Sequence, residues 1–259
     1  MNGTTTDWLR NLTKPSLPRL RLVCFPHVGG GASFFQPWAE RTPDDVQLMA
    51  VRYPGREDRL LEEPATNMRD LAEPLVRACA GMRDLPLAFF GHSMGAAVAF
   101  EVAWRLEREY GAALSCLFVS ARPGPGRDGL GLRYHEMTDE ELLESISGLG
   151  GTRSAVLDNP ELRELVLPAI RADYGLIARY RAPSTRLNAP ITVYSGDSDT
   201  DVDEAAVAAW SKVTASAFAA RSFEGGHFYL TEKTPALLGD LFAGLGSAVP
   251  RSLPEERNA

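Results

Sequence analysis

The sequence predicts an α/β fold in which a mostly parallel central sheet is covered by helices on both faces. Three observations lead to this prediction. Short apolar segments alternate with stretches whose apolar residues recur at helical spacing. The apolar segment 87–90 passes into a helical pattern at Met94 with almost no loop. Hydrophobic residues make up 44% of the 259 residues, which is enough for the buried core that a parallel sheet requires.

The first half of the chain supplies most of the expected sheet. Residues 1–18 are polar and contain prolines, so we expect a loose N-terminal arm. Residues 19–123 form the first part of the expected core. Its strands are LRLVCF, VQLMAV, LAFF and LSCLFVS, and its helices are FFQPWAERTP, NMRDLAEPLVRACAGM, and a third that runs from Met94 to Tyr110 and stops at Gly111.

Residues 124–185 interrupt the alternation and predict a helical insertion. Thr138 and Glu141 form a capping box at the start of one helical stretch, and a second stretch covers 159–181 with no strand between them. We expect this insertion to act as a lid over the site. Residues 186–247 restore the sheet with APITVYSG, a helix, a last strand and a final helix, and 248–259 form an expected disordered tail.

Composition limits the classes of function. The formal net charge of −7 argues against nucleic acid as a partner, and no apolar run is long enough to cross a membrane. The N-terminus has no apolar leader segment, so we expect a cytoplasmic protein. Cys24, Cys79 and Cys116 are far apart in apolar stretches, which predicts buried free thiols and no metal site.

The turn GHSMG, residues 91–95, carries the strongest chemical signal. A serine hydroxyl needs an adjacent base to become a nucleophile at neutral pH. A tight strand-to-helix turn exposes the Ser93 oxygen above the sheet edge, and glycines two residues before and after it avoid collisions with the neighbouring strand and helix. The helix N-terminus behind Ser93 offers free N–H groups to an oxyanion.

An acid and then a histidine base must follow Ser93 along the chain, because a triad of this architecture has the order serine, acid, histidine. Among the four histidines, at positions 27, 92, 135 and 227, His227 lies in a glycine-rich loop after the last strand and is the expected base. We expect His92 to pack internally and His135 to lie on the surface. Spacing alone leaves Asp197, Asp199 and Asp201 open as the acid.

Five motifs closely resemble those of the type II thioesterases of polyketide and nonribosomal peptide pathways: FPHVGGGAS, YPGREDR, FFGHSMGA, SARPGP and FEGGHFYL. The resemblance covers about residues 20–245. It implies an α/β-hydrolase fold with a helical lid, and a catalytic triad of Ser93, Asp199 and His227. It also implies that the backbone N–H groups of Met94 and Val28 form the oxyanion hole.

The implied reaction is hydrolysis of an acyl group from the phosphopantetheine arm of an acyl or peptidyl carrier protein, through an acyl-enzyme. No metal or other cofactor is expected, because the substrate itself carries the phosphopantetheine, and we expect a monomer. An acyltransferase or a general carboxylesterase on the same fold would use the same residues with another acceptor or acyl donor. A non-catalytic binding module would require a broken triad, whereas all three members are present.

Overall fold

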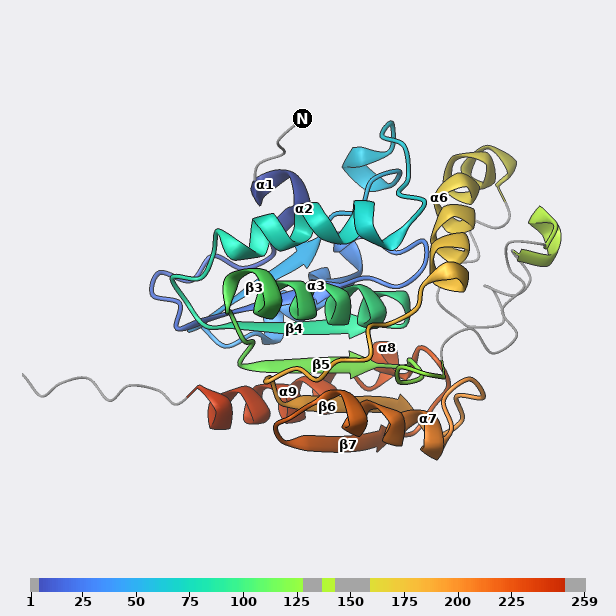
Figure 1. Cartoon of the computed structure of the whole chain (residues 1–259). Helices are drawn as coiled ribbons and strands as arrows, with labels where there is room; N and C mark the ends of the chain where they lie inside the picture. Colours follow the sequence, from blue (N-terminus) through green and yellow to red (C-terminus); the bar gives the residue numbers. More distant parts are fainter. Residues whose placement is uncertain (1–4, 128–136, 143–158, 250–259) are drawn as a thin grey trace, which may run out of the picture.

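The structure, a computed structural model, describes residues 5–127, 137–142 and 159–249 (Figure 1). Its centre is a seven-stranded sheet in the order β1-β3-β2-β4-β5-β6-β7. All neighbouring strands are parallel except β1, which pairs antiparallel with β3. The strands are β1 (Leu9–Asn11), β2 (Leu20–Phe25), β3 (Val46–Val51), β4 (Leu87–His92), β5 (Cys116–Ser120), β6 (Ile191–Gly196) and β7 (Phe218–Phe223).

Helices cover both faces of this sheet, as the sequence predicts. The α-helices are α1 (Thr5–Trp8), α2 (Met68–Ala80), α3 (Met94–Tyr110), α6 (Pro160–Arg179), α7 (Glu204–Ala209), α8 (Tyr229–Glu232) and α9 (Thr234–Ala248). Within the described residues, three 3-10 helices accompany them: η1 (Ala32–Arg41), η2 (Glu57–Arg59) and η3 (Trp210–Val213). One buried apolar cluster joins the sheet to α2, α3 and η3, and a second joins it to η1, α8 and α9.

The local signals for α3 are confirmed at both ends. The helix begins at Met94 directly behind β4 and ends at Tyr110. Gly111 follows with a φ of 63°, in the left-handed region that favours glycine, and its N–H bonds to the carbonyl oxygens of Leu106 and Glu107. The three cysteines are free and buried, as expected.

The loose arm predicted for residues 1–18 is wrong for residues 5–11, which form α1 and β1. Leu9 pairs with Val51 across the sheet edge and is only 4% exposed. A strand of three residues is too short to show an alternating pattern, so its formation depends on a partner strand that lies far along the chain.

The predicted insertion is described only in part. Between β5 and β6, the described residues include α6 and no strand, and the capping box is confirmed: Thr138 Oγ1 accepts from the Glu141 N–H at 3.2 Å and the Glu141 carboxylate accepts from the Thr138 N–H at 2.8 Å. Figure 1 shows α6 beyond the carboxyl ends of the strands. Residues 128–136 and 143–158, and the tail from 250 onward, lie outside the described residues.

Candidate active site

The turn between β4 and α3 holds Ser93 in a strained backbone conformation. Its φ is 54° and its ψ is −116°, a region that side-chain-bearing residues rarely occupy. The Ser93 N–H is tied to the Ser120 carbonyl oxygen of the adjacent strand at 2.8 Å. Because α3 begins at the next residue, the Met94 N–H has no acceptor within the helix and is available to an oxyanion.

The two glycines of this turn permit close contacts that any side chain would block. A Cβ added to Gly91 would lie 2.5 Å from Ala96 Cα, inside the backbone of α3. A Cβ added to Gly95 would lie 2.6 Å from the Pro26 carbonyl oxygen at the end of β2. The steric requirement predicted for these glycines is therefore present in the structure, with backbone atoms against both positions.

Asp199 and His227 meet at the same edge of the sheet, although 28 residues separate them. The carboxylate Oδ2 of Asp199 accepts a hydrogen bond from His227 Nδ1 at 2.9 Å, and the side chains are 2% and 9% exposed. Glycine again permits the approach, since a Cβ on Gly196 would lie against the backbone of Gly225 and Gly226. This bond leaves Nε2 as the free nitrogen of the imidazole, the one that could take a proton from a hydroxyl.

The other aspartates of this loop have other partners. Asp197 accepts from the Gly225 N–H at 3.0 Å, and Asp203 caps α7 by accepting from the Ala206 N–H at 2.6 Å. The Asp201 N–H donates to Asp199 Oδ1 at 3.1 Å and so helps to orient that carboxylate. Of the three acids that spacing left open, the structure joins Asp199 to the histidine.

Two further histidines, His27 and His92, lie beside the site, and burial favours the neutral form of both. His92, which precedes Ser93, is fully buried, and its Nδ1 shares a hydrogen bond of 2.9 Å with Ser120 Oγ. Burial lowers the pKa of His27 to about 3, with the charges of His227 and Arg56 adding to the effect, and burial likewise holds the pKa of His92 well below its ordinary value. His92 packs internally, as expected, with its ring centroid 5.3 Å from that of His227; His135 lies outside the described residues.

The loop after β2 brings the second expected oxyanion donor toward this edge. The Gly30 N–H closes a turn on the His27 carbonyl oxygen at 3.0 Å, and Gly29 at its third position has a φ of 69°. Val28 is half-buried and packs against a small apolar cluster that includes Ile170 and Tyr174 of α6. The loop is thus in direct contact with α6, the described helix of the predicted insertion.

Three residues that the sequence did not assign to the site brace this loop: Arg56, Glu57 and Asp173. Arg56 forms a two-pronged ion pair with Asp173 of α6, at 2.6 and 2.9 Å. Glu57 accepts from the Ser33 N–H at 2.9 Å. Arg56 and Glu57 belong to the YPGRE motif, which the sequence links to the thioesterase family without showing a role for either residue. Nothing in the sequence singles out Asp173, because it is one of several acidic residues on a helical pattern.

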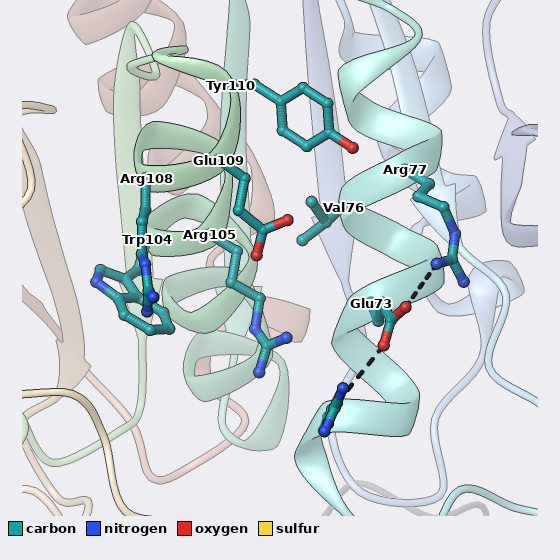
Figure 2. Close-up of a pocket in the computed structure, with 9 residues that line it drawn as sticks. Glu73, Val76, Arg77, Trp104, Arg105, Arg108, Glu109 and Tyr110 are labelled. Carbon is teal, nitrogen blue, oxygen red and sulfur yellow. Dashed lines mark hydrogen bonds and ion pairs between the residues drawn. The ribbon is translucent and has the colours of Figure 1, made fainter.

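Hollows in the surface do not by themselves identify the site. A hollow of about 430 Å³ is lined by Asp199, His227 and their loops. A larger one of about 610 Å³ lies between α2 and α3 (Figure 2), where Glu73 pairs with the arginines at 69 and 77. No residue of the Ser93 turn or the Asp199–His227 pair lines the larger hollow.

One cluster of side chains has the donor atoms for a cation. Asp199, Asp201 and His227 offer ligand atoms within 4.8 Å of one another. Two of these residues form the acid–base pair itself, in which Asp199 Oδ2 and His227 Nδ1 already bond to each other. In the described part of the chain, no helix is both long and apolar enough to cross a membrane.

Comparison with known proteins identifies the family. A model of the thioesterase domain matches residues 20–245. The chain belongs to the thioesterase domain family. Thioesterase PikA5 of Streptomyces venezuelae is 38% identical over 259 residues, which cover 99% of this chain and 91% of the relative. A probable cadicidin biosynthesis thioesterase of Streptomyces griseus is 38% identical over 239 residues and 91% of this chain, and the chain spans just under two thirds of that relative, 65%.

A solved structure extends the match to the fold of this thioesterase domain. The type II thioesterase BorB from the borrelidin biosynthetic cluster superposes with a TM-score of 0.85 and 40% identity, over 92% of this chain and 97% of that one. The predicted α/β-hydrolase fold and the resemblance to type II thioesterases are both confirmed. The chain is accordingly an enzyme of the thioester-hydrolysing class.

Proposed function

We propose that this chain hydrolyses acyl groups from the phosphopantetheine arm of acyl or peptidyl carrier proteins, with Ser93 as nucleophile, His227 as base and Asp199 as the acid that orients it. The observation that carries the proposal is that the strained Ser93 turn, which begins α3, lies beside the Asp199–His227 pair: the ring of His92, next to Ser93, has its centroid 5.3 Å from that of His227. A relative supports the biosynthetic setting, since the type II thioesterase BorB comes from the borrelidin biosynthetic cluster.

The chemistry proceeds in two acyl transfers. Ser93 Oγ attacks the thioester carbonyl while His227 Nε2 takes the hydroxyl proton, and Asp199 stabilises the imidazolium that forms. The N–H groups of Met94 and Val28 bind the oxyanion of the tetrahedral intermediate. The intermediate collapses, the pantetheine thiolate leaves with a proton from His227, and Ser93 is acylated. Water, deprotonated by His227, then attacks the ester carbonyl. His227 returns that proton to Ser93 Oγ as the ester C–O bond breaks, and the acid is released.

The remaining parts of the proposal concern the surroundings of this chemistry. We propose that residues 124–185 form a lid over the acyl group, supported by the contact of α6 with the Val28 loop. The reaction as written needs no metal or other cofactor. Three buried free cysteines favour a reducing compartment, which supports action in the cytoplasm, and we propose a monomer.

The test is acyl release from a panel of carrier proteins loaded with short and long acyl chains, compared with the same acyl groups on coenzyme A. We expect faster release from carrier proteins, and no release by Ser93→Ala protein with an unchanged melting temperature. Adding alcohol or amine acceptors to the assay separates hydrolysis from acyl transfer. Transfer to an added acceptor in preference to water would contradict the proposal in favour of an acyltransferase.

A further inference from the structure

We propose that Arg56 and Asp173 are positioning residues, which hold the backbone of residues 28–30 so that the Val28 N–H faces the oxyanion, and which make that alignment depend on the docking of α6. The inference rests on the proposed function and adds to it two residues that touch neither the serine nor its base. The Arg56–Asp173 ion pair connects residues 117 positions apart in the sequence and joins the segment after β3 to α6.

Hydrogen bonds connect this pair directly to the backbone of the loop. Asp173 Oδ2 accepts from the Gly29 N–H at 2.8 Å as well as from Arg56 Nη1 at 2.6 Å. Arg56 Nη1 also donates to the Gly30 carbonyl oxygen at 3.3 Å. The peptide groups Val28–Gly29 and Gly30–Gly31 are therefore held by the two members of one ion pair. The Val28 N–H lies one residue before the first of these bonds.

Packing limits the loop from the side of α6. A Cβ added to Gly29 would lie 2.8 Å from Ile170 Cγ1, so the helix lies directly against the loop backbone there. Ile170 is one turn before Asp173 on the same face of α6, and the Val28 side chain packs on the cluster that contains Ile170. A shift of α6 would change the position of residues 28 and 29 together.

Because Arg56 and Asp173 are buried, each needs the charge of the other. Arg56 and Asp173 are 7% and 3% exposed, so either charge alone would lie uncompensated in a low dielectric. Arg56 in addition donates from Nε to the Pro54 carbonyl oxygen at 3.3 Å, and its guanidinium lies 5.2 Å from the Tyr53 ring centroid. These contacts fix the guanidinium plane, which gives the bidentate bond its direction. The YPGRE motif thereby acquires a physical role in the reaction.

The experiment compares Asp173→Asn and Arg56→Lys with a matched control, Glu101→Gln. Glu101 is also a buried carboxylate, 5% exposed, that binds one arginine, Arg105, at 2.7 Å, and it has no bond to the loop. It also accepts from the Tyr180 hydroxyl at the end of α6 at 3.1 Å, and the amide oxygen of a glutamine can still accept that bond. The readouts are kcat and KM on one acyl thioester, the inhibition constant of an acyl trifluoromethyl ketone that forms an oxyanion on Ser93, and the melting temperature.

A displaced donor lowers the rate less than a deleted one, so we expect Asp173→Asn to lower kcat by about 10- to 100-fold with little change in KM. Inhibition by the ketone should weaken in parallel, because its adduct needs the same N–H groups. Arg56→Lys keeps the positive charge but loses the bidentate guanidinium bond, so its kcat should lie between those of the wild type and Asp173→Asn. It tests the same role if Asp173→Asn protein does not fold. Glu101→Gln should lose melting temperature and keep kcat.

Two results would overturn the inference: wild-type kcat and ketone affinity in folded Asp173→Asn or Arg56→Lys protein, or an equal loss of kcat in Glu101→Gln. Failure of the underlying function gives a different result, since wild-type protein would then show no turnover, or Ser93→Ala would retain it. The positioning role is therefore judged only in an enzyme that Ser93→Ala inactivates.

Discussion

At the scale of single residues, Ser93 combines two demands that oppose each other. A φ of 54° at a residue with a side chain costs free energy, of order 1–3 kcal/mol, yet this conformation exposes the hydroxyl above the sheet. The Ser120 carbonyl oxygen and the close-packed glycines maintain it. The strain is tolerated because the surrounding backbone leaves the turn no other conformation.

This conflict predicts opposite effects of one substitution on stability and activity. Ser93→Gly should abolish turnover and raise the free energy of unfolding relative to Ser93→Ala by about 1 kcal/mol, because glycine adopts positive φ freely. Urea denaturation measures the stability and a thioester assay the turnover. A serine-directed phosphonate should label the wild type only at Ser93; labelling at another residue, with activity retained in Ser93→Gly, would contradict both the strain argument and the mechanism.

The hydrogen bonds of the β6–α7 loop predict which carboxylate orients the base. Loss of the bond from Asp199 to His227 Nδ1 leaves the imidazole free to adopt the wrong tautomer, so Asp199→Asn should lower kcat by about 10⁴-fold. Asp197→Asn and Asp201→Asn are matched controls from the same loop, and should stay within about tenfold of the wild type, because neither side chain bonds to the histidine. Greater sensitivity at Asp201 would reject the assignment.

At the scale of elements, the sequence predicted whatever is encoded locally. The strand at 20–25, the turn around Ser93 and the end of α3 each carry their signal within a few residues: an apolar run, a pair of glycines, and a glycine at the helix end. Strand β1 was not predicted because three residues are too few to show a periodic pattern. Arg56 and Asp173 escaped because their pairing depends on how α6 docks, which no local pattern encodes.

The same limit applies to the roles of apolar residues on α6. Periodicity shows that Ile177 and Leu165 lie on a helix, but not what they face. In the structure Ile177 is 3% exposed and belongs to the core cluster shared with α2 and α3, whereas Leu165 is 49% exposed. The two ends of α6 therefore have different surroundings: its second half packs into the core, and its first half does not.

We therefore expect Ile177→Ala to lower the free energy of unfolding by about 2–4 kcal/mol and to leave the preference for acyl chain length unchanged. Leu165→Ala, on the same helix but exposed, should change stability by less than about 0.5 kcal/mol. Chemical denaturation and kcat/KM for short and long acyl thioesters test both statements. A changed chain-length preference in Ile177→Ala protein of near wild-type stability would show that Ile177 contacts the acyl group and would reject its core assignment.

At the scale of the whole molecule, the parallel sheet explains why residues from distant segments meet. The carboxyl ends of β2, β4, β6 and β7 lie at one edge, so the loops that follow them bring Val28, Ser93, Asp199 and His227 together. Two close backbone contacts lie at this edge: Gly95 brings the start of α3 against the end of β2, and Gly196 brings the end of β6 against Gly225 in the loop after β7. The candidate site is thus a product of topology, and each loop contributes one group to it.

The same convergence buries two neutral histidines, which gives stability a defined dependence on pH. The pKa of His27 is about 3 in the folded protein and about 6.5 in an unfolded chain, so between these values only the unfolded state binds the proton. Stability is therefore full above about pH 6.5 and falls as the pH decreases toward the folded value. Carboxylates of ordinary pKa contribute little above about pH 5, so the histidines dominate from there to pH 6.5.

His27 should remove about 2 kcal/mol from the free energy of unfolding between pH 7.5 and pH 5, since one proton corresponds to about 1.4 kcal/mol per pH unit once the unfolded state is protonated. His27→Asn replaces the ring by a smaller group that does not titrate. Its overall stability at pH 7.5 should be lower than that of the wild type, because the aromatic contacts of His27 with Phe34 and Phe228 are lost. Its further loss of stability on acidification from pH 7.5 to pH 5 should nevertheless be smaller than that of the wild type by about 2 kcal/mol.

Urea unfolding of the wild type and His27→Asn at pH 7.5, 6.5, 5.75 and 5.0 gives this difference directly. Parallel stability curves for the two proteins would mean that His27 binds its proton in the folded state, and its neutral role beside the site would then be wrong.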